Sequence, residues 1–374
     1  MRIVRFAIRG KTKYGILENN IIRSLRGSPF ARFRSPSNSW VFDGHSYELG
    51  EVRLLAPCLP SKIVGLGLNY PGHAKETGLP IPRLPLIFLK PSTAVIGPGD
   101  AIILPRSFQR VDYEGELAVV MGRKAKDVPK DKAEDYVLGY TCLNDVSERY
   151  AQREDGQWTR AKSFDTFAPI GPWIETEVTP HDLKIETYLN GELRQSAYTS
   201  DLIFGVHDLI SFISGVMTLL PGDIIATGTP SGIGRMSPGD VVEVRIDKIG
   251  TLRNFALVGL RKILAKFKEL VDGYKVIPAS RDKKFGLGAA FEEVKIEHRE
   301  WRRDCSQSPN SSIVKANGKS EASASRIASK PDSLRINFLY RAYKGNGCFH
   351  ILLFTYSLTK LPLAPTYSTK VKLK

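Results

Sequence analysis

Cysteine is scarce in this sequence, and its few cysteines stand far apart. The 374 residues contain four, Cys58, Cys142, Cys305 and Cys348, and none lies in a CxxC spacing. Disulfide frameworks and structural zinc sites need paired or closely spaced cysteines, so neither is expected. Such cysteine usage is typical of the reducing cytoplasm, where we expect this protein to work.

Long apolar runs are missing as well. The N-terminal segment MRIVRFAIRGKTKYG has scattered charges and no continuous apolar core, unlike a signal peptide. The longest apolar run near the C-terminus, CFHILLFTYSL at 348–358, is too short to span a bilayer. The sequence therefore predicts no membrane partner.

An excess of acidic residues is also absent, because the net charge is +15. The basic excess is confined to one part of the chain. Residues 255–374 contain 23 Lys and Arg against 10 Asp and Glu, whereas residues 1–254 contain 31 against 29. A near-neutral body does not indicate a nucleic-acid partner. Only the basic tail leaves nucleic-acid or anionic-surface binding open, and we expect it to be a solvated appendage.

Composition along the chain indicates three parts. Residues 1–57 alternate short apolar pieces with turn formers, which predicts a small β-rich N-terminal domain. Residues 58–254 are dense in strand patterns with few helical ones, which predicts a mainly β catalytic domain with short helices (α+β) rather than a doubly wound sheet. For residues 255–374 we expect a basic, largely disordered extension. Its apolar periodicity predicts an amphipathic helix at 255–275, and its Ser/Asn/Lys-rich, aperiodic composition predicts disorder at 306–333.

Three local patterns predict particular elements. Asn190-Gly191 between two strand-like pieces is a strong hairpin signal. Apolar residues three and four apart predict a helix at 206–220, and a second helical pattern covers 130–139.

In DYEGELAVVMG at 112–122, the second half, 117–121, is expected to be a strand buried on both faces, and three carboxylates precede it. Asp112, Glu114 and Glu116 are spaced two apart, so a continuous strand would point all three to one face. Mg²⁺ and Mn²⁺ prefer oxygen ligands and would offset their repulsion. We expect Glu114 and Glu116 to converge on such an ion, with a third ligand from Asp145 after the next apolar strand. A solvent-facing strand edge paired with Lys or Arg is the alternative.

The segment HAKE places His73 and Glu76 three residues apart, on one side of a helical turn. A carboxylate hydrogen-bonded to an imidazole fixes its tautomer and raises its basicity, which suits a general base that acts through water. A surface His–Glu pair on a loop is the competing interpretation.

Six segments in this order resemble the fumarylacetoacetate hydrolase family, in its smaller prokaryote-type form. They are GLGLNYPGHAKETG at 65–78, LIFLKPSTAVIGPGD at 86–100, VDYEGELAVVMG at 111–122, GYTCLNDVSERYAQ at 139–152, TRAKSFDTFAPIGPW at 159–173 and PGDIIATGTPSGIG at 221–234. The resemblance implies a mixed β-sandwich roll, usually a homodimer, that holds Mg²⁺ or Mn²⁺. The family binds the ion through two glutamates and an aspartate, which match Glu114, Glu116 and Asp145.

The resemblance also implies further members of the active site. In the family, a lid segment carries a His–Glu pair that activates the attacking water. An Arg, a Gln and a Lys stabilise negative charge that develops on the substrate, and a threonine contacts the substrate carboxylate. The matching positions are His73, Glu76, Arg149, Gln152, Lys162 and Thr229. For any lone Arg or Lys, the residue type alone indicates no more than a solvated surface charge.

One residue departs from the S-x-R-D-x-Q pattern of the family. Tyr150 stands where an Asp is common, between Arg149 and Gln152. If that Asp orients the lysine or takes part in proton transfer, Tyr150 changes the acid–base balance of the site. Tautomerase and decarboxylase activities that rely on it are then less expected, whereas the predicted metal site is unaffected.

Together these features predict a divalent-metal-dependent enzyme that acts on small 2-oxo or β-diketo carboxylic acids through an enolate stabilised by the ion. The leading prediction is hydrolysis of a C–C bond in an acylpyruvate-type substrate. An isomerase or tautomerase of the 2-hydroxyhepta-2,4-dienedioate type and a decarboxylase of the oxaloacetate type remain open. A non-catalytic binding protein that keeps the fold is the rival from another class.

Overall fold

The computed structural model describes residues 1–34, 40–105 and 109–258, together with the backbone of five strands between 274 and 373. The chain divides into two compact units, Met1–Gly259 and Leu260–Lys374. The disorder predicted at 306–333 lies outside the described residues. Within the described part, no helix has both the length and the apolar character needed to cross a membrane.

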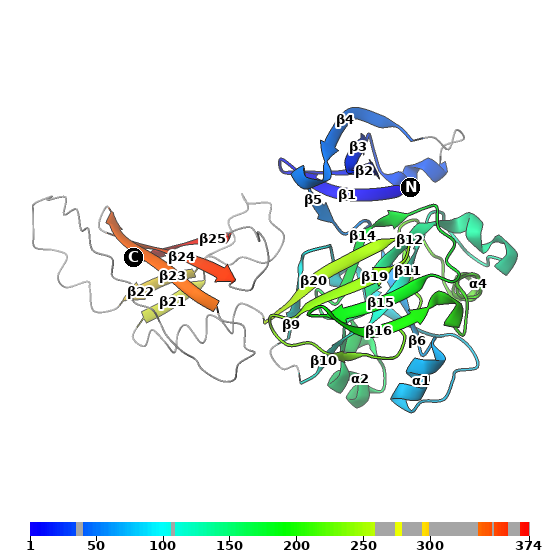
Figure 1. Ribbon diagram of the computed structural model, residues 1–374. Helices are drawn as coiled ribbons and strands as arrows, with labels where there is room; N and C mark the ends of the chain where they lie inside the picture. The colour runs from blue at the N-terminus through cyan, green and yellow to red at the C-terminus, as the bar shows by residue number, and fades with distance from the viewer. Residues whose placement is uncertain are drawn as a thin grey trace, which may run out of the picture. The chain divides into compact units, whose positions relative to one another are not determined.

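The first unit is mainly β with short helices, as predicted (Figure 1). Its strands are β1 (Arg2–Ile8), β2 (Lys11–Glu18), β3 (Ile21–Leu25), β4 (Phe42–Glu48), β5 (Arg53–Leu55), β6 (Lys62–Gly67), β7 (Leu86–Pro91), β8 (Val95–Ile96), β9 (Ala101–Leu104), β10 (Val111–Tyr113), β11 (Gly115–Met121), β12 (Val137–Asn144), β13 (Ser147–Glu148), β14 (Ala168–Glu175), β15 (Lys184–Leu189), β16 (Glu192–Tyr198), β17 (Ile224–Ala226), β18 (Gly234–Arg235), β19 (Val241–Ile246) and β20 (Gly250–Val258). Its helices are α1 (Pro71–Thr77), α2 (Arg149–Asp155), α3 (Thr159–Lys162) and α4 (Val206–Val216), with short 3-10 helices at Pro29–Arg34, Leu49–Glu51, Ser92–Ala94, Lys130–Tyr136 and Thr199–Asp201.

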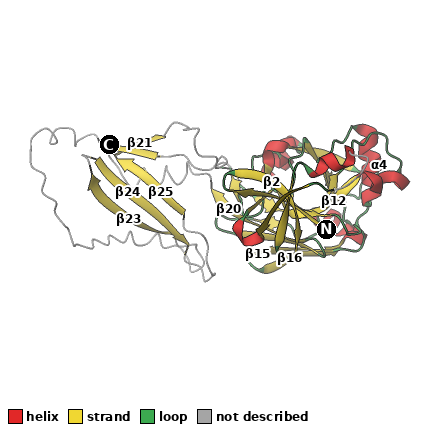
Figure 2. Ribbon diagram, turned by 90° about the horizontal axis from the view of Figure 1, so that it is seen from above, coloured by secondary structure: helices red, strands yellow, loops and turns green. Residues whose placement is uncertain are grey.

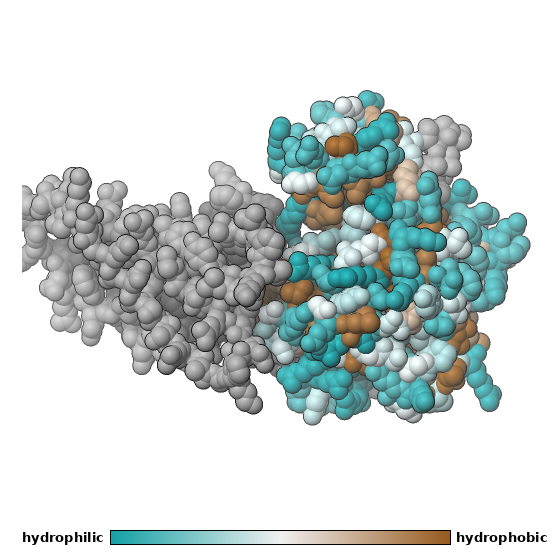
Figure 3. All heavy atoms as spheres, in the orientation of Figure 1, coloured by the Kyte–Doolittle hydropathy of each residue, from teal (hydrophilic) through white to brown (hydrophobic). Residues whose placement is uncertain are grey.

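These strands form three sheets. The largest runs in the order β4-β3-β2-β1-β14-β12-β11-β17-β6-β7, with β5 paired to β1 and β8 to β14. A second sheet has the order β16-β15-β19-β20-β9, and a small third one has the order β13-β10-β18. The helices lie around the edge of the strands (Figure 2). In Figure 3, the visible face of this unit is mostly hydrophilic, with scattered hydrophobic residues.

The centre of the large sheet is β11, which is buried along its whole length. Leu117, Val119 and Met121 pack in one hydrophobic core with residues of β15, β19 and α4. Ala118 and Val120 pack in a second core with residues of β14 and of the N-terminal strands. From Leu117 to Met121 the strand carries only apolar side chains and is covered on both sides, which confirms the prediction that this stretch is buried on both faces.

The first 57 residues are β-rich and share the large sheet with the rest of the unit. Strand β1 pairs antiparallel with β14, with Arg2 opposite Glu175 and Ile3 opposite Ile174. Ile3 and Ile16 are buried in the same core as Ala118 and Val120 of β11.

Local sequence signals explain two connections. Asn190 and Gly191 adopt φ of +53° and +84° between β15 and β16, as a two-residue hairpin turn of primed type requires. The helix predicted at 206–220 forms over Val206–Val216, and Met217 is already extended. The pattern at 130–139 forms a 3-10 helix over Lys130–Tyr136 before β12 begins.

Around the predicted domain boundary at residue 254, strand β20 continues to Val258. Phe255–Val258 pair parallel with β9, so these four residues are strand rather than the start of the predicted amphipathic helix. Residues 259–273 lie outside the described part of the chain. In the second unit, the described backbone forms a sheet in the order β21-β22-β25-β24-β23. Its strands are β21 (Tyr274–Pro278), β22 (Val294–His298), β23 (Ile336–Gly345), β24 (Cys348–Ser357) and β25 (Tyr367–Leu373).

Candidate active site

The segment that carries the predicted glutamates is interrupted at Glu114. Strand β10 ends at Tyr113, β11 begins at Gly115, and the two belong to different sheets. A Cβ on Gly115 would lie 2.0 Å from Thr187 Oγ1, so a larger residue here would collide with the Thr187 side chain of β15. The assumption of one continuous strand is therefore wrong, and Asp112 is not a member of the carboxylate cluster described next.

Three buried carboxylates meet at the start of β11. One oxygen each from Glu114, Glu116 and Asp145 lies within 4.8 Å of the others. Antiparallel pairing of β11 with β12 explains the convergence, because Gly115 lies opposite Asn144 at the end of β12. The next amide, that of Asp145, donates to the Glu114 carbonyl at 2.8 Å. The predicted Glu-x-Glu spacing and the aspartate after the next strand thus form one cluster.

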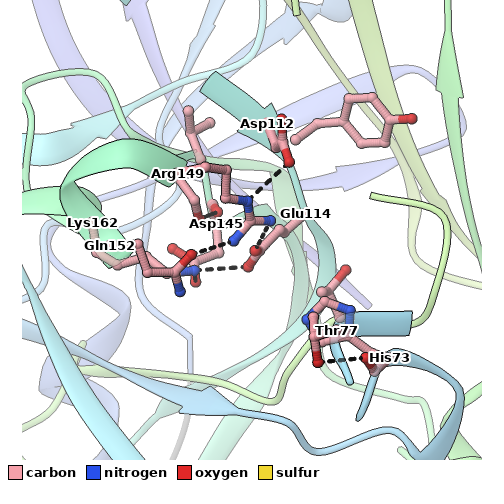
Figure 4. A network of polar contacts seen from close by, with 12 residues as sticks. His73, Thr77, Asp112, Glu114, Asp145, Arg149, Gln152 and Lys162 are labelled. Atoms are coloured by element: carbon pink, nitrogen blue, oxygen red, sulfur yellow. Dashed lines mark hydrogen bonds and ion pairs between the residues drawn. The ribbon is translucent and has the colours of Figure 1, made fainter. Parts of the chain in front are cut away.

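Two cations reach this cluster from α2 and α3 (Figure 4). Lys162 Nζ donates to Glu114 Oε2 at 2.8 Å and to Asp145 Oδ2 at 2.6 Å. Arg149 donates to Glu114 and, through Nε, to Asp112 Oδ2 at 2.9 Å. Asp112 therefore serves as a buried partner of the guanidinium, which fixes the side chain that also contacts Glu114.

The remaining residues of α2 lie differently. Arg149 Nη1 donates to Gln152 Oε1 at 2.8 Å, which brings Gln152 into the network in Figure 4. Glu148 caps the helix by accepting from the Ala151 amide at 2.7 Å. Tyr150 is 51% exposed. The carboxylates that pair with Lys162 are Glu114 and Asp145, so the lysine has its ion-pair partners without an aspartate at position 150.

Lys90 on β7 is a member of the site that the sequence did not reveal. Its side chain is fully buried, and Nζ donates to Asp145 Oδ1 at 2.6 Å and to the Val146 carbonyl at 3.2 Å. The sequence does contain a signal for this residue, since Lys90 ends the apolar run LIFLK. A lysine in a buried strand must place its ammonium group next to a hydrogen-bond acceptor. Asp145 is thus held by a lysine on each of its two oxygens.

Burial and neighbouring charges act in opposite directions within the cluster. Burial alone would raise the pKa of Glu114, but Arg149 and Lys162 hold it well below its usual range. Burial raises the pKa of Glu116, and the negative charges of Asp145 and Glu114 raise it further. Burial lowers the pKa of Lys162, yet Asp145 and Glu114 outweigh this effect and its pKa is raised. Glu116 is therefore the carboxylate whose charge is least compensated by protein cations.

A divalent metal ion fits this donor set. The three side chains offer carboxylate oxygens, the ligands that Mg²⁺ and Mn²⁺ prefer, and they lie close enough to share one ion. The Gly228 amide donates to Glu116 Oε2 at 2.9 Å, which orients that carboxylate. A dication would also offset the repulsion that raises the pKa of Glu116.

His73 and Glu76 lie on α1, across the site from α2 and α3; His73 is labelled in Figure 4. His73 Nδ1 lies 3.1 Å from Glu76 Oε2, and Thr77 donates to the His73 carbonyl at 3.0 Å. The His73 side chain is 9% exposed and that of Glu76 is 32% exposed. The predicted pair is therefore formed, with His73 buried and Glu76 partly exposed.

The glycine-rich segment TGTPSGIG contacts both groups. Besides the Gly228 amide on Glu116, the Gly232 amide donates to Glu76 Oε1 at 3.0 Å. Thr229 is buried between these two points, and its hydroxyl donates to the Gly115 carbonyl at 2.9 Å. Since a hydroxyl has a single proton, this bond must open before Thr229 Oγ1 can donate to a substrate carboxylate.

Tyr70, immediately before α1, is a second buried residue that sequence reasoning passed over. Its hydroxyl has no hydrogen-bond partner among the described residues. Burial raises the pKa of Tyr70, and the charge of Glu116 adds to this effect. A tyrosine three residues before His73 was the available signal, but its burial depends on tertiary packing, which the sequence does not show.

Comparison with known proteins identifies two matching regions. The profile of the fumarylacetoacetate (FAA) hydrolase C-terminal family matches residues 62–256, and the Rv2993c-like N-terminal profile matches residues 1–57. An uncharacterised protein of Archaeoglobus fulgidus is 58% identical over 217 residues, which cover 58% of this chain and 87% of that protein. A 2,4-didehydro-3-deoxy-L-rhamnonate hydrolase of Sphingomonas sp. is 41% identical over 270 residues, 68% of this chain and 95% of the hydrolase.

Solved structures support the same relationship. The 2-hydroxyhepta-2,4-diene-1,7-dioate isomerase of Mycobacterium marinum superposes with a TM-score of 0.63 at 45% identity, over 69% of this chain and 98% of the isomerase. A maleylpyruvate hydrolase of Sphingobium sp. SYK-6, in complex with manganese(II) and pyruvate, superposes with a TM-score of 0.58 at 31% identity, over 69% of this chain and all of the hydrolase. With a matching profile over more than half of its length and this fold, the chain belongs to the fumarylacetoacetate hydrolase family.

Proposed function

We propose that this protein is a divalent-metal-dependent hydrolase that cleaves a C–C bond in a small acylpyruvate-type 2-oxo acid. The observation that carries the proposal is the His73–Glu76 pair, hydrogen-bonded at 3.1 Å and anchored to the loop that also orients Glu116. A general base at this position can deprotonate a water molecule, as a hydrolysis reaction requires. The maleylpyruvate hydrolase with manganese and pyruvate supports the same class of chemistry.

Glu114, Glu116 and Asp145 would hold the ion, with Mg²⁺ proposed and Mn²⁺ as the alternative. When bound, a divalent ion polarises substrate carbonyl oxygens as a Lewis acid and favours negative charge there. Arg149 and Lys162 stay protonated, because the pKa of each is raised. Their charges would stabilise negative charge that develops on the substrate during bond cleavage.

His73 would accept a proton from water, with Glu76 holding the imidazole in the tautomer that leaves Nε2 free to do so. The water oxygen bonds to the distal carbonyl carbon, and the C–C bond to the neighbouring methylene carbon breaks. The electron pair of that bond goes to the departing 2-oxo acid as an enolate, which takes up a proton at carbon. The products are a carboxylic acid and pyruvate, so one water is consumed in each turnover.

An isomerase is the second candidate. It is favoured by the similarity to the Mycobacterium marinum 2-hydroxyhepta-2,4-diene-1,7-dioate isomerase, at 45% identity. Proton transfer between carbon atoms would use the same cations but would not consume water. Product analysis separates the two, because hydrolysis alone yields two molecules from one.

The test is a panel of acylpyruvates and other 2-oxo acids, incubated with protein that has been stripped with EDTA and then reloaded with Mg²⁺ or Mn²⁺. We expect metal-dependent formation of pyruvate and a carboxylic acid, measured by NMR. The Glu116→Ala variant should lose both metal binding and turnover. If wild-type protein shows no metal-dependent turnover of any 2-oxo acid, the proposed function is wrong.

Two further properties are part of this proposal. We propose a homodimer, which size-exclusion chromatography with light scattering would test. We also propose a cytoplasmic protein. Cys58 and Cys142 are free thiols, the state that a reducing compartment maintains.

A further inference from the structure

Gln195 is a buried glutamine on β16, outside the residues assigned above to metal binding or catalysis. It is 1% exposed, and its strand belongs to the second sheet rather than to the large sheet that carries the glutamates. Its place in the hairpin is set by β15, where Thr187 is its partner across the strand pair. A buried amide must have its hydrogen bonds satisfied, so its partners indicate why it is there.

Each of its partners belongs to the candidate active site or adjoins it. Gln195 Oε1 accepts from the Gly115 amide at 3.0 Å. Its Nε2 donates to Thr229 Oγ1 and to the Pro230 carbonyl, both at 2.8 Å. Because Thr229 Oγ1 itself donates to the Gly115 carbonyl at 2.9 Å, Gln195, Gly115 and Thr229 form a closed ring of hydrogen bonds.

This ring lies between the two halves of the site. Gly115 separates Glu114 from Glu116, so fixing its amide fixes the backbone between two carboxylates of the cluster. On the other side, the loop that holds Thr229 orients Glu116 through the Gly228 amide and Glu76 through the Gly232 amide. A shift of this loop would therefore move a carboxylate of the cluster and the partner of His73 together.

We propose that Gln195 is a positioning residue that fixes the distance between the carboxylate cluster and the His73–Glu76 pair. It acts through Gly115 and through the loop 227–232, and it touches neither substrate nor ion. The inference rests on the proposed function, because it assigns Gln195 to the same metal centre and water-activating pair. Partners that orient metal ligands commonly change affinity or activity 10- to 100-fold when they are removed.

The test compares Gln195→Met with Thr187→Val in the full-length protein. Methionine has a similar length but cannot make the three hydrogen bonds. Thr187 is the matched control, because it is buried opposite Gln195 and its hydroxyl has no partner among the described residues, while valine keeps its shape. Circular dichroism establishes that each variant is folded, and calorimetric titration with Mn²⁺ measures metal affinity without reference to turnover.

For Gln195→Met we expect Mn²⁺ affinity to fall about tenfold or more. We also expect kcat at saturating Mn²⁺ to fall at least tenfold, with a smaller change in KM. Thr187→Val should stay within about twofold of wild type in all three quantities. Wild-type behaviour of Gln195→Met, or equal losses in the two variants, would overturn the proposal. Since wild-type binding and turnover are measured in the same series, failure of the proposed function itself is recognised separately.

A second variant covers the case in which Gln195→Met does not fold. Gln195→Glu keeps the shape and an acceptor for the Gly115 amide, but a carboxyl group has at most one proton, so it cannot donate both hydrogen bonds to the loop. We expect kcat to fall at least tenfold while Mn²⁺ affinity changes less than in Gln195→Met. An unchanged kcat in Gln195→Glu would contradict the role assigned to the loop contacts.

Discussion

The two halves of the candidate site are built in different ways. The carboxylate half is buried, and its Glu114 and Asp145 are paired with cations that are themselves at most 9% exposed: Arg149, Lys162 and Lys90. The other half is a single His–Glu pair on a seven-residue helix, with the Glu76 side chain 32% exposed. In the first half, cations hold Glu114 and Asp145 and the Gly228 amide orients Glu116, whereas in the second half the Glu76 carboxylate is partly exposed to water.

The carboxylate half is built to hold charge, whereas the His73–Glu76 pair is placed to move a proton. Buried ions that lose a partner leave an uncompensated charge in a low-dielectric interior, so the carboxylate half is tied to the stability of the fold. In the His–Glu pair only Glu76 is partly exposed, so removing its carboxylate should cost little stability and act mainly on chemistry. Substitutions in the two halves should therefore affect different measurements.

The largest expected effect is on stability, in Glu114→Ala. This change removes a carboxylate partner from both Arg149 and Lys162, and we expect the free energy of unfolding to fall by about 3 kcal/mol, measured by urea denaturation of the metal-free protein. Glu76→Ala is the control in the other half, where this carboxylate is 32% exposed, and its free energy of unfolding should fall by about 0.5 kcal/mol or less. If the free energy of unfolding fell by similar amounts in the two variants, the proposed difference between the two halves of the site would be wrong.

A large effect on chemistry alone is expected for His73→Ala. Without the proposed base, hydrolysis should slow by about 100-fold or more, while Mn²⁺ affinity and the urea midpoint stay close to wild type. Stopped assays of pyruvate release give the rate, and calorimetric titration gives the affinity. An unchanged rate would exclude His73 from the mechanism and favour the isomerase interpretation.

The smallest effect is expected at Tyr150, where the family pattern commonly has an aspartate. Because this side chain is 51% exposed and Lys162 already has two carboxylate partners, Tyr150→Ala should change the rate by less than about threefold. Its free energy of unfolding should stay within about 0.5 kcal/mol of wild type. A tenfold change in rate would show that position 150 acts on substrate directly.

Much of the fold follows from local sequence signals. The sequence predicted the Asn190-Gly191 turn, the doubly buried stretch of β11 and helix α4. Turn chemistry and apolar periodicity depend only on residues that are close together in the sequence. The continuation of β20 to Val258 was not predicted, since pairing with β9 decides it and β9 lies some 150 residues earlier. Backbone pairing with a distant partner overrides the helical pattern that begins at Phe255.

The same distinction between local signals and distant contacts explains which site residues were predicted. Glu114, Glu116 and Asp145 were predicted together because their spacing shows which strand ends carry them. Lys90 and Gln195 were missed, because each reaches the site from another strand, through contacts 55 to 80 residues apart in sequence. The role of Asp112 as a partner of Arg149 also depends on the break at Glu114, which spacing alone does not display.

Strand β11 carries Glu116 and is also the element shared by two hydrophobic cores. The three carboxylates meet only when β11 and β12 are paired, so an ion would bind the folded protein in preference to the unfolded chain. Binding energy would then add to the resistance of the whole unit to heat, and the melting temperature would rise with the concentration of free ion. A bound cation would in this way stabilise the folded state as well as take part in catalysis.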